Sequence, residues 1–136
     1  MSDSNSQRSA QTPVQRGKLT LRTLAMPADA NPSGDIFGGW VMSQMDIASA
    51  ICAVERAGSR VVTVAVDRMS FLQPVNVGDV LCVYSEVDRI GRTSITVHVE
   101  AWVRRNHQKE HFQVTHGTFT FVALDEHGKP MKVPDS

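Results

Sequence analysis

The chain has 136 residues, which fits one domain, and its 14 basic residues balance its 14 acidic residues. A neutral chain lacks the positive charge on which nucleic-acid binding depends, so no nucleic-acid partner is expected. No stretch reaches the roughly 20 apolar residues of a membrane span, and no apolar segment typical of a secretory signal is found at the N-terminus. We therefore expect a cytoplasmic protein that does not bind membranes.

The segment 1–17 differs in composition from the rest of the chain. It is rich in Ser and Gln and contains almost no apolar residues. This predicts a disordered tail, followed by a single domain over residues 18–134. Leucines two or three residues apart indicate a strand at Lys18–Ala25. Two prolines and no apolar periodicity predict a loop at Met26–Ser33.

Residues Trp40–Ala57 follow a helical pattern. One apolar stripe is formed by residues four, three and four apart, namely Val41, Met45, Ala48 and Cys52. Further apolar residues extend this surface almost all the way round the predicted helix: Trp40, Ile47, Ala50, Ile51 and Val54. Gly58 is expected to end the helix. A helix that is apolar on nearly every side must be enclosed by other elements.

Four strands are expected after the helix. Their ranges are Arg60–Arg68, Val80–Ile90, Thr93–Arg104 and His111–Leu124. The last three follow one another through short turns, at residues 91–92 and 106–110, which favours antiparallel pairing. The fold class is therefore α+β, with one long central helix wrapped by a curved antiparallel sheet of about five strands. One sheet cannot cover such a helix, so its remaining surface must meet another molecule, most simply a second copy.

The cysteines and histidines do not indicate a metal site. Cys52 and Cys82 lie apart in apolar patterns, without the CxxC spacing of a zinc or redox site. We expect both to be buried free thiols. The five histidines all lie in the C-terminal half, at positions without metal-ligand spacing, so no metal is expected.

Glycines cluster just before the predicted helix, at Gly34, Gly38 and Gly39. At a helix N-terminus the backbone N–H groups are free and favour a developing negative charge. The segment could therefore form an oxyanion hole. The alternative is a tight turn that leads into a closely packed helix. The spacing matches neither a dinucleotide-binding fingerprint nor a P-loop.

Asp46 interrupts the apolar pattern of the helix. A buried carboxylate is costly unless it is paired or used, so Asp46 is either a reactive group or the partner of a buried Arg or of capping polar groups. It lies seven residues after Gly39, about 10 Å along a helix axis. A single ester or thioester carbon cannot contact both residues of one helix. If both serve one site, Asp46 must come from a neighbouring subunit.

Three segments carry a resemblance to a known family. They are MPADANPSGDIFGGWVMSQMD, RVVTVAVDRMSFLQPVNVGDVL and GRTSITVHVEAWV. Together they resemble the hotdog-fold acyl-CoA thioesterases of the small bacterial YciA type, over about Leu19 to Pro134. The resemblance implies a dimer whose two sheets become continuous, and commonly a hexamer that is a trimer of such dimers. It also implies hydrolysis of acyl-CoA to a fatty acid and free CoA, without a cofactor.

The resemblance also assigns residues. The catalytic aspartate of the family matches Asp46, acting either as general base or as nucleophile, and the oxyanion-binding glycines match Gly38 and Gly39. Asp35 matches a position where many relatives carry Asn, which can donate a hydrogen bond that an ionised Asp cannot. The role of Asp35 is therefore open between holding a water, capping the helix and acting in a protonated form. Thr63 is a candidate to line the site.

Candidates for the CoA phosphates are Arg92, with Thr93 and Ser94 beside it, and Arg60. The alternative is that these arginines are exposed and simply solvated.

Two other functions remain open. A hotdog dehydratase or hydratase would need a His near the glycines, and none lies in that segment. A non-catalytic acyl-CoA-binding protein would keep the fold but would not need Asp46. The sequence does not predict acyl-chain length.

Overall fold

The structure is a computed structural model that describes residues 14–105 and 111–136. Its elements are β1 (Lys18–Leu24), a 3-10 helix η1 (Pro27–Asp29), α2 (Gly38–Ala57), β2 (Arg60–Phe71), β3 (Val80–Ile90), β4 (Ser94–Arg104) and β5 (His111–Leu124). The expected turn at 106–110 and the segment 1–13 of the expected tail lie outside the described residues. The single domain over 18–134 stays a prediction.

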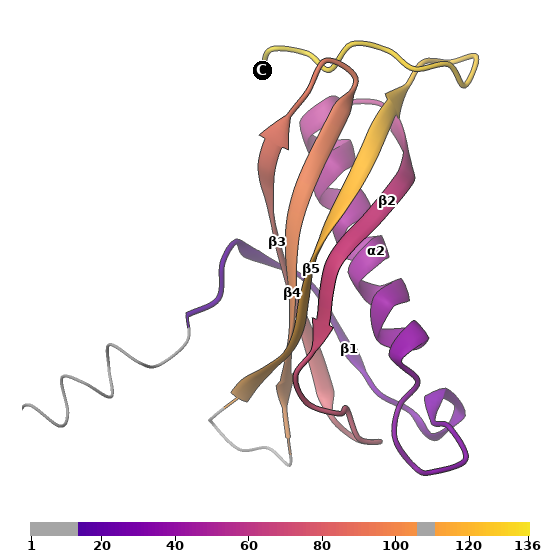
Figure 1. Ribbon diagram of the computed structural model, residues 1–136, viewed down its shortest axis with the longest axis vertical. Coiled ribbons are helices and arrows are strands. Elements are labelled where there is room, and N and C mark those ends of the chain that lie inside the picture. Colours follow the sequence, from indigo (N-terminus) through magenta and orange to yellow (C-terminus); the bar gives the residue numbers. More distant parts are fainter. Residues whose placement is uncertain (1–13, 106–110) are drawn as a thin grey trace, which may run out of the picture.

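The five strands form one antiparallel sheet in the order β1-β3-β4-β5-β2. Figure 1 shows the sheet curving around α2, with β2 beside the helix at one edge. The predicted α+β fold, with one long helix wrapped by a curved antiparallel sheet of five strands, is therefore confirmed. Since β1 and β2 are the outermost strands, each leaves one row of backbone groups without a partner strand in the protomer.

Several predicted boundaries were wrong. The helix begins at Gly38, two residues before the predicted start, and β2 continues past Arg68 to Phe71. Arg68 has a positive φ of 55°, within an irregularity of the β2–β5 pairing between Asp67 and Ser70. Such a bulge interrupts the alternation of side chains, so the sequence pattern stops before the strand does. The short helix η1 was not predicted.

The core lies between α2 and the inner face of the sheet. The buried helix stripe is the predicted one: Val41, Met45, Ala48 and Cys52 are at most 7% exposed. The sheet contributes β-branched and aromatic side chains that are at most 1% exposed, namely Ile95, Val97, Val99, Phe119 and Phe121. Gly58 ends the helix as expected, with a φ of 66° and an N–H that donates to the carbonyl of Val54 at 2.8 Å. Cys52 and Cys82 are buried free thiols, as predicted.

The other side of α2 is not covered. Ile47, Ile51 and Val54 are 48%, 41% and 42% exposed, and they follow each other at helical spacing. This observation agrees with the expectation that one sheet cannot enclose the whole helix. In the part of the chain that the structure describes, no helix is long and apolar enough to cross a membrane.

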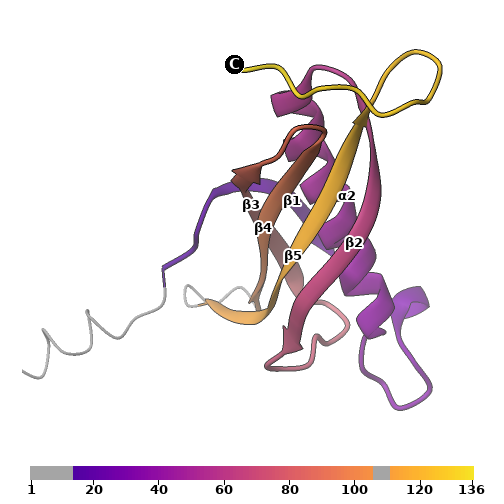
Figure 2. The same ribbon diagram turned by 45° about the horizontal axis from the view of Figure 1, so that its top comes forward.

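The two ends of the described chain pack against the sheet. Arg16 forms ion pairs with Glu86 (2.6 Å) and Asp88 (3.2 Å) of β3. At the other end, the N–H of Val133 donates to the carbonyl of Arg92 at 2.8 Å. Figure 2 shows the C-terminal segment crossing the end of the sheet, next to the C-terminus of α2.

Candidate active site

Asp46 lies on the side of α2 that faces β2. The hydroxyl of Thr63, on β2, donates a hydrogen bond to Oδ1 of Asp46 at 2.7 Å. The Asp46 carboxylate, which was expected to be buried, is half-buried in the protomer, because β2 is an edge strand that leaves this side open. Over residues 14–105 and 111–136, no cation forms an ion pair with Asp46. The alternative of a buried Arg partner is therefore not found among these residues.

A depression of about 270 Å³ connects Asp46 with the start of the helix. It is lined by Gly39, Met42, Ser43, Asp46, Thr63, Val66 and Phe119. Gly39 and Asp46 thus border one depression, although they remain seven residues, about 10 Å, apart along the helix axis. Apolar side chains, the hydroxyl group of Ser43, and one carboxylate with a fixed hydroxyl partner line it, a composition typical of small-molecule sites.

Gly38 and Gly39 form the first turn of α2 rather than the loop before it. The carbonyl of Phe37 accepts hydrogen bonds from the N–H groups of Trp40 (3.1 Å) and Val41 (3.3 Å). Among the described residues, the N–H groups of Gly38 and Gly39 donate no hydrogen bond, and both glycines are exposed. The low helix propensity of Gly explains the misplaced start. Two unused N–H donors at a helix N-terminus can stabilise a developing oxyanion.

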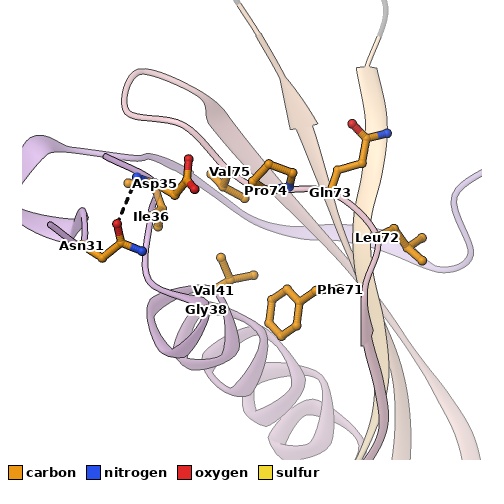
Figure 3. Close-up of a pocket in the computed structure, with 10 residues that line it drawn as sticks. All are labelled: Asn31, Asp35, Ile36, Gly38, Val41, Phe71, Leu72, Gln73, Pro74 and Val75. Atoms are coloured by element: carbon orange, nitrogen blue, oxygen red, sulfur yellow. Dashed lines mark hydrogen bonds between the residues drawn. The ribbon is translucent and has the colours of Figure 1, made fainter. Parts of the chain in front are cut away.

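The two glycines border different cavities. Gly38 lines a second pocket of about 350 Å³, shown in Figure 3, with Asn31, Asp35, Ile36, Val41, Phe71, Leu72, Gln73, Pro74 and Val75. A Cβ on Gly38 would lie 3.4 Å from the Phe71 ring, whereas a Cβ on Gly39 would meet nothing within 4 Å. Asp35 belongs to this second pocket and not to the depression at Asp46. Figure 3 shows its carboxylate directed away from Gly38.

Asn31 is a polar residue of this pocket that the sequence interpretation missed. Its Oδ1 accepts hydrogen bonds from the N–H groups of Ser33 (2.9 Å) and Asp35 (3.2 Å). These bonds assign the oxygen, so the amide nitrogen is the free end of the side chain. Figure 3 shows this nitrogen on the pocket side, and it donates to no described residue. In the sequence, Asn31 could only be recognised as a turn residue, because Asn before Pro-Ser-Gly is typical of loops.

The predicted phosphate-binding residues lie together at the end of the sheet that is far from the start of α2. Ser94 pairs with Val122, and Arg60 pairs with Leu124 at the end of the same strand. The side chains of Arg60 and Arg92 are exposed and form no ion pair with a described residue. Thr63 follows Arg60 by three residues, about 10 Å along the strand. The structure therefore brings Thr63 to Asp46, and Arg60 to the end of the sheet that carries Arg92, Thr93 and Ser94.

A family model described as the thioesterase superfamily matches residues 33–109. The acyl-CoA thioester hydrolase YciA of Escherichia coli is 51% identical over 124 residues, which are 89% of this chain and 94% of the relative. An uncharacterised acyl-CoA thioester hydrolase of Haemophilus influenzae is 52% identical over 122 residues, 88% of this chain and 79% of the relative.

Solved structures agree with these relatives. A hexameric thioesterase from Yersinia pestis has a TM-score of 0.87 and 53% identity, over 90% of this chain and 100% of that chain. An acyl-CoA hydrolase from Staphylococcus aureus, in complex with butyryl coenzyme A, has a TM-score of 0.79 and 35% identity, over 84% and 70% of the two chains. The chain belongs to the thioesterase superfamily, and within it to the hotdog-fold acyl-CoA thioesterases of the YciA type.

Proposed function

We propose that this chain hydrolyses the thioester bond of acyl-CoA, which releases a carboxylic acid and free CoA. The observation that carries the proposal is the Asp46 carboxylate, which is held by Thr63, forms no ion pair with a described residue and borders the same depression as Gly39. A carboxylate in this setting is available to take a proton or to form a bond.

The chemistry requires one nucleophile and one oxyanion site. Thr63 donates to Oδ1 of Asp46, which leaves Oδ2 to take a proton from a water, or to attack the thioester carbonyl itself. In either case negative charge develops on the carbonyl oxygen. The N–H groups of Gly38 and Gly39 stabilise it at the N-terminus of α2. In the base route, the water oxygen bonds to the carbonyl carbon, the C–S bond breaks, and the thiolate of CoA takes up the proton that Asp46 accepted. In the nucleophile route, loss of the thiolate leaves the acyl group on Asp46 as an anhydride, and a water then hydrolyses it, which releases the acid, restores the carboxylate and supplies the proton for the thiolate.

Asn31 is proposed as a further donor to the thioester carbonyl. The Staphylococcus aureus hydrolase was studied with one aspartate, and separately one asparagine, replaced by alanine. The asparagine precedes the aspartate there by the same separation as Asn31 precedes Asp46 in this chain. This equal separation supports a match of the family's Asn position to Asn31 rather than to Asp35. The unused amide nitrogen of Asn31 supports this role, because it can donate where the Asp35 carboxylate cannot.

The complete site is proposed to require two subunits. Gly39 and Asp46 of one helix are about 10 Å apart, too far for one thioester carbon. If two β2 edges pair antiparallel, the two helices run antiparallel, and Gly39 of one protomer approaches Asp46 of the partner subunit. Several of the solved relatives are hexameric. We therefore propose a dimer as the catalytic unit and a trimer of dimers as the assembly.

Arg92 and Arg60, with Thr93 and Ser94, are proposed to bind the CoA phosphates at the far end of the sheet. Their exposed guanidinium groups form no ion pair with a described residue, so phosphate would meet unneutralised charge. Arg92→Ala should mainly raise KM, because it removes binding shared by the ground and transition states. A fall in kcat with unchanged KM would contradict this role.

The experiment that tests the proposed function is the release of free thiol from a series of acyl-CoA substrates, from acetyl-CoA to palmitoyl-CoA. Thiol release that depends on enzyme concentration is expected. Acyl-CoA binding without thiol release would instead indicate the non-catalytic binding protein. Hydration of an enoyl-CoA without thiol release would indicate the hydratase. The cytoplasmic location, and the absence of nucleic-acid and membrane partners, stay predictions.

A further inference from the structure

The segment that joins β2 to β3 forms one wall of the pocket beside Gly38. Phe71 to Val75 line this pocket together with Ile36 and Val41. Two contacts connect the wall to the segment that leads into α2. The N–H of Ile36 donates to the carbonyl of Val75 at 2.9 Å, and Asp35 and Asn76 form an isolated β-bridge. The position of the wall is thus coupled to the position of the helix start.

Asp79 anchors the other end of this wall. Its side chain is 2% exposed. Oδ1 accepts from Nε of Arg105 (2.9 Å), and Oδ2 accepts from Nη2 of Arg105 (3.0 Å) and from the N–H of Asn76 (2.8 Å). The carbonyl of Asp79 accepts from the N–H of Ala25 at 2.9 Å, just past β1. The carboxylate of Asp79 therefore joins the wall to the end of β4, and its backbone carbonyl joins it to the end of β1.

Arg105, just past β4, is the partner of Asp79, and we call the two residues the clamp. Arg105 fixes the orientation of the wall as well as its distance from the sheet. Its Nη2 also donates to the carbonyl of Pro74 at 3.4 Å, and its guanidinium lies 5.0 Å from the centroid of the Phe112 ring. The hydrogen bonds to Asp79 raise the pKa of Arg105 above its usual value. A bidentate pair fixes orientation as well as distance. A buried ion pair adds little stability compared with an apolar pair of the same size. We therefore expect this pair to matter more for the position of the wall than for the stability of the fold.

We propose that Asp79 and Arg105 are a positioning pair. They hold the wall formed by the segment between β2 and β3 against the start of α2, and so determine how tightly the acyl chain of the substrate binds. The inference rests on the proposed function. The acyl chain is the apolar part of acyl-CoA, and the wall and its neighbours present Leu72, Pro74 and Val75 to a pocket of about 350 Å³. Neither Asp79 nor Arg105 lines the pocket, so both act through the wall.

The test uses three variants of the full chain. Arg105→Lys keeps the charge but loses the bidentate geometry, and Arg105→Met removes both. Because Arg105→Met leaves Asp79 buried without its partner, the double variant Asp79→Asn with Arg105→Met removes both charges and guards against misfolding. Val83→Ala is the matched control, since Val83 is fully buried in β3 and borders none of the pockets described. KM and kcat are measured with short and long acyl-CoA, alongside thermal melting.

The expected result is a rise in KM of severalfold or more for long acyl chains, a smaller rise for acetyl-CoA, and little change in kcat. Arg105→Lys should fall between the wild type and Arg105→Met. Val83→Ala should lower the melting temperature without changing the dependence of KM on chain length. If the Arg105 and double variants behave like Val83→Ala, the pair only stabilises the fold and the proposal is wrong.

A second measurement does not depend on activity. Amide hydrogen exchange of Ile36, whose N–H bonds to Val75, should accelerate in Arg105→Met, while the amide of Met131, bonded to Ala123 at the far end, should not. If the wild type releases no thiol but Arg105→Met still accelerates exchange at Ile36, the proposed function is wrong and the clamp stands. Active variants with unchanged exchange at Ile36 would overturn the clamp alone.

Discussion

The two edges of the sheet differ in length and in the apolar surface that they expose. β1 has seven residues, and its pairing with β3 is irregular between Leu19 and Leu21. It begins with Lys18, just after Arg16, which pairs with two carboxylates of β3. Short strands, irregular pairing and charge are the usual means by which proteins prevent an edge from pairing with another chain.

β2 is longer and exposes more apolar side chains, although its pairing with β5 is irregular at two places. It has 12 residues, and Val62, Val64 and Phe71 are 43%, 55% and 48% exposed. The uncovered apolar surface of α2 adds Ile47 and Ile51. A long apolar edge strand of this kind favours association with a second copy rather than with solvent.

Each edge is also connected to α2 through one carboxylate of the helix. Glu55 forms an ion pair with Lys18 of β1 at 3.1 Å, so its charge is neutralised. Among the described residues, Asp46 accepts only a hydrogen bond from the hydroxyl group of Thr63 of β2, so no cation neutralises its charge. We therefore call β1 the closed edge and β2 the open edge, at which the partner subunit and the reactive carboxylate are proposed to lie.

The largest effect is expected from Asp46→Asn, because the amide keeps the shape and the Thr63 contact but cannot accept a proton. Turnover should fall by about 100-fold or more, the usual range for loss of a general base. Thermal stability should be unchanged or higher, because an unneutralised charge is removed. Glu55→Gln, on the same helix at the closed edge, is the control and should stay within about twofold of wild-type turnover. Equal losses in the two variants would contradict the comparison.

A charge on the β2 edge should weaken assembly. Val64→Lys should destabilise association by roughly 2 kcal/mol, on the order of thirtyfold in the dissociation constant, because the ammonium group must be desolvated. Activity should fall as the assembly dissociates. Leu24→Lys, at an exposed position on β1, should leave the assembly intact. Analytical ultracentrifugation over a concentration series measures both variants, and a Val64→Lys protein with wild-type mass and activity would exclude the β2 interface.

Gly39→Ala separates activity from stability at the open edge. An added Cβ would meet nothing within 4 Å in the protomer, so the helix should gain about 0.5 kcal/mol. Activity should fall on the order of tenfold, because the methyl group displaces the reacting carbonyl from the N–H donors. Gly58→Ala at the other end of α2 should lower the stability and leave the activity unchanged, since its φ of 66° disfavours Ala. Chemical denaturation and thiol release on the same preparations decide the outcome.

The smallest effect is expected at the closed edge, from Arg16→Gln. Its side chain is 50% exposed, although Glu86 and Asp88 raise its pKa. Exposed ion pairs contribute about 0.5 kcal/mol or less to the free energy of unfolding, and salt reduces this further. Urea denaturation at low and high salt tests this. A loss of stability several times larger, and insensitive to salt, would show instead that the segment 14–17 is an essential part of the sheet.

The functional segment was only partly predictable from its residues. The run from Gly34 to Asp46 indicated an oxyanion site and a reactive carboxylate, because Gly and Asp are unusual in an apolar helix. The start of α2 was misplaced, since propensity argues against Gly in a helix while the first-turn N–H groups need no acceptor. Asn31 was read as a turn residue because its turn geometry, with the oxygen used and the nitrogen free, arises only in the folded loop.

The sequence by itself determined the periodic elements of this protein: the buried stripe of α2, its end at Gly58 and the five strands. Periodicity is local, so it can be read from neighbouring residues. The strand order, the difference between the two edges and the Asp79–Arg105 pair were decided only by the tertiary structure. Asp79 and Arg105 are 26 residues apart, in segments without periodicity. Their contact exists because antiparallel pairing of β3 with β4 brings the beginning of one strand to the end of the other.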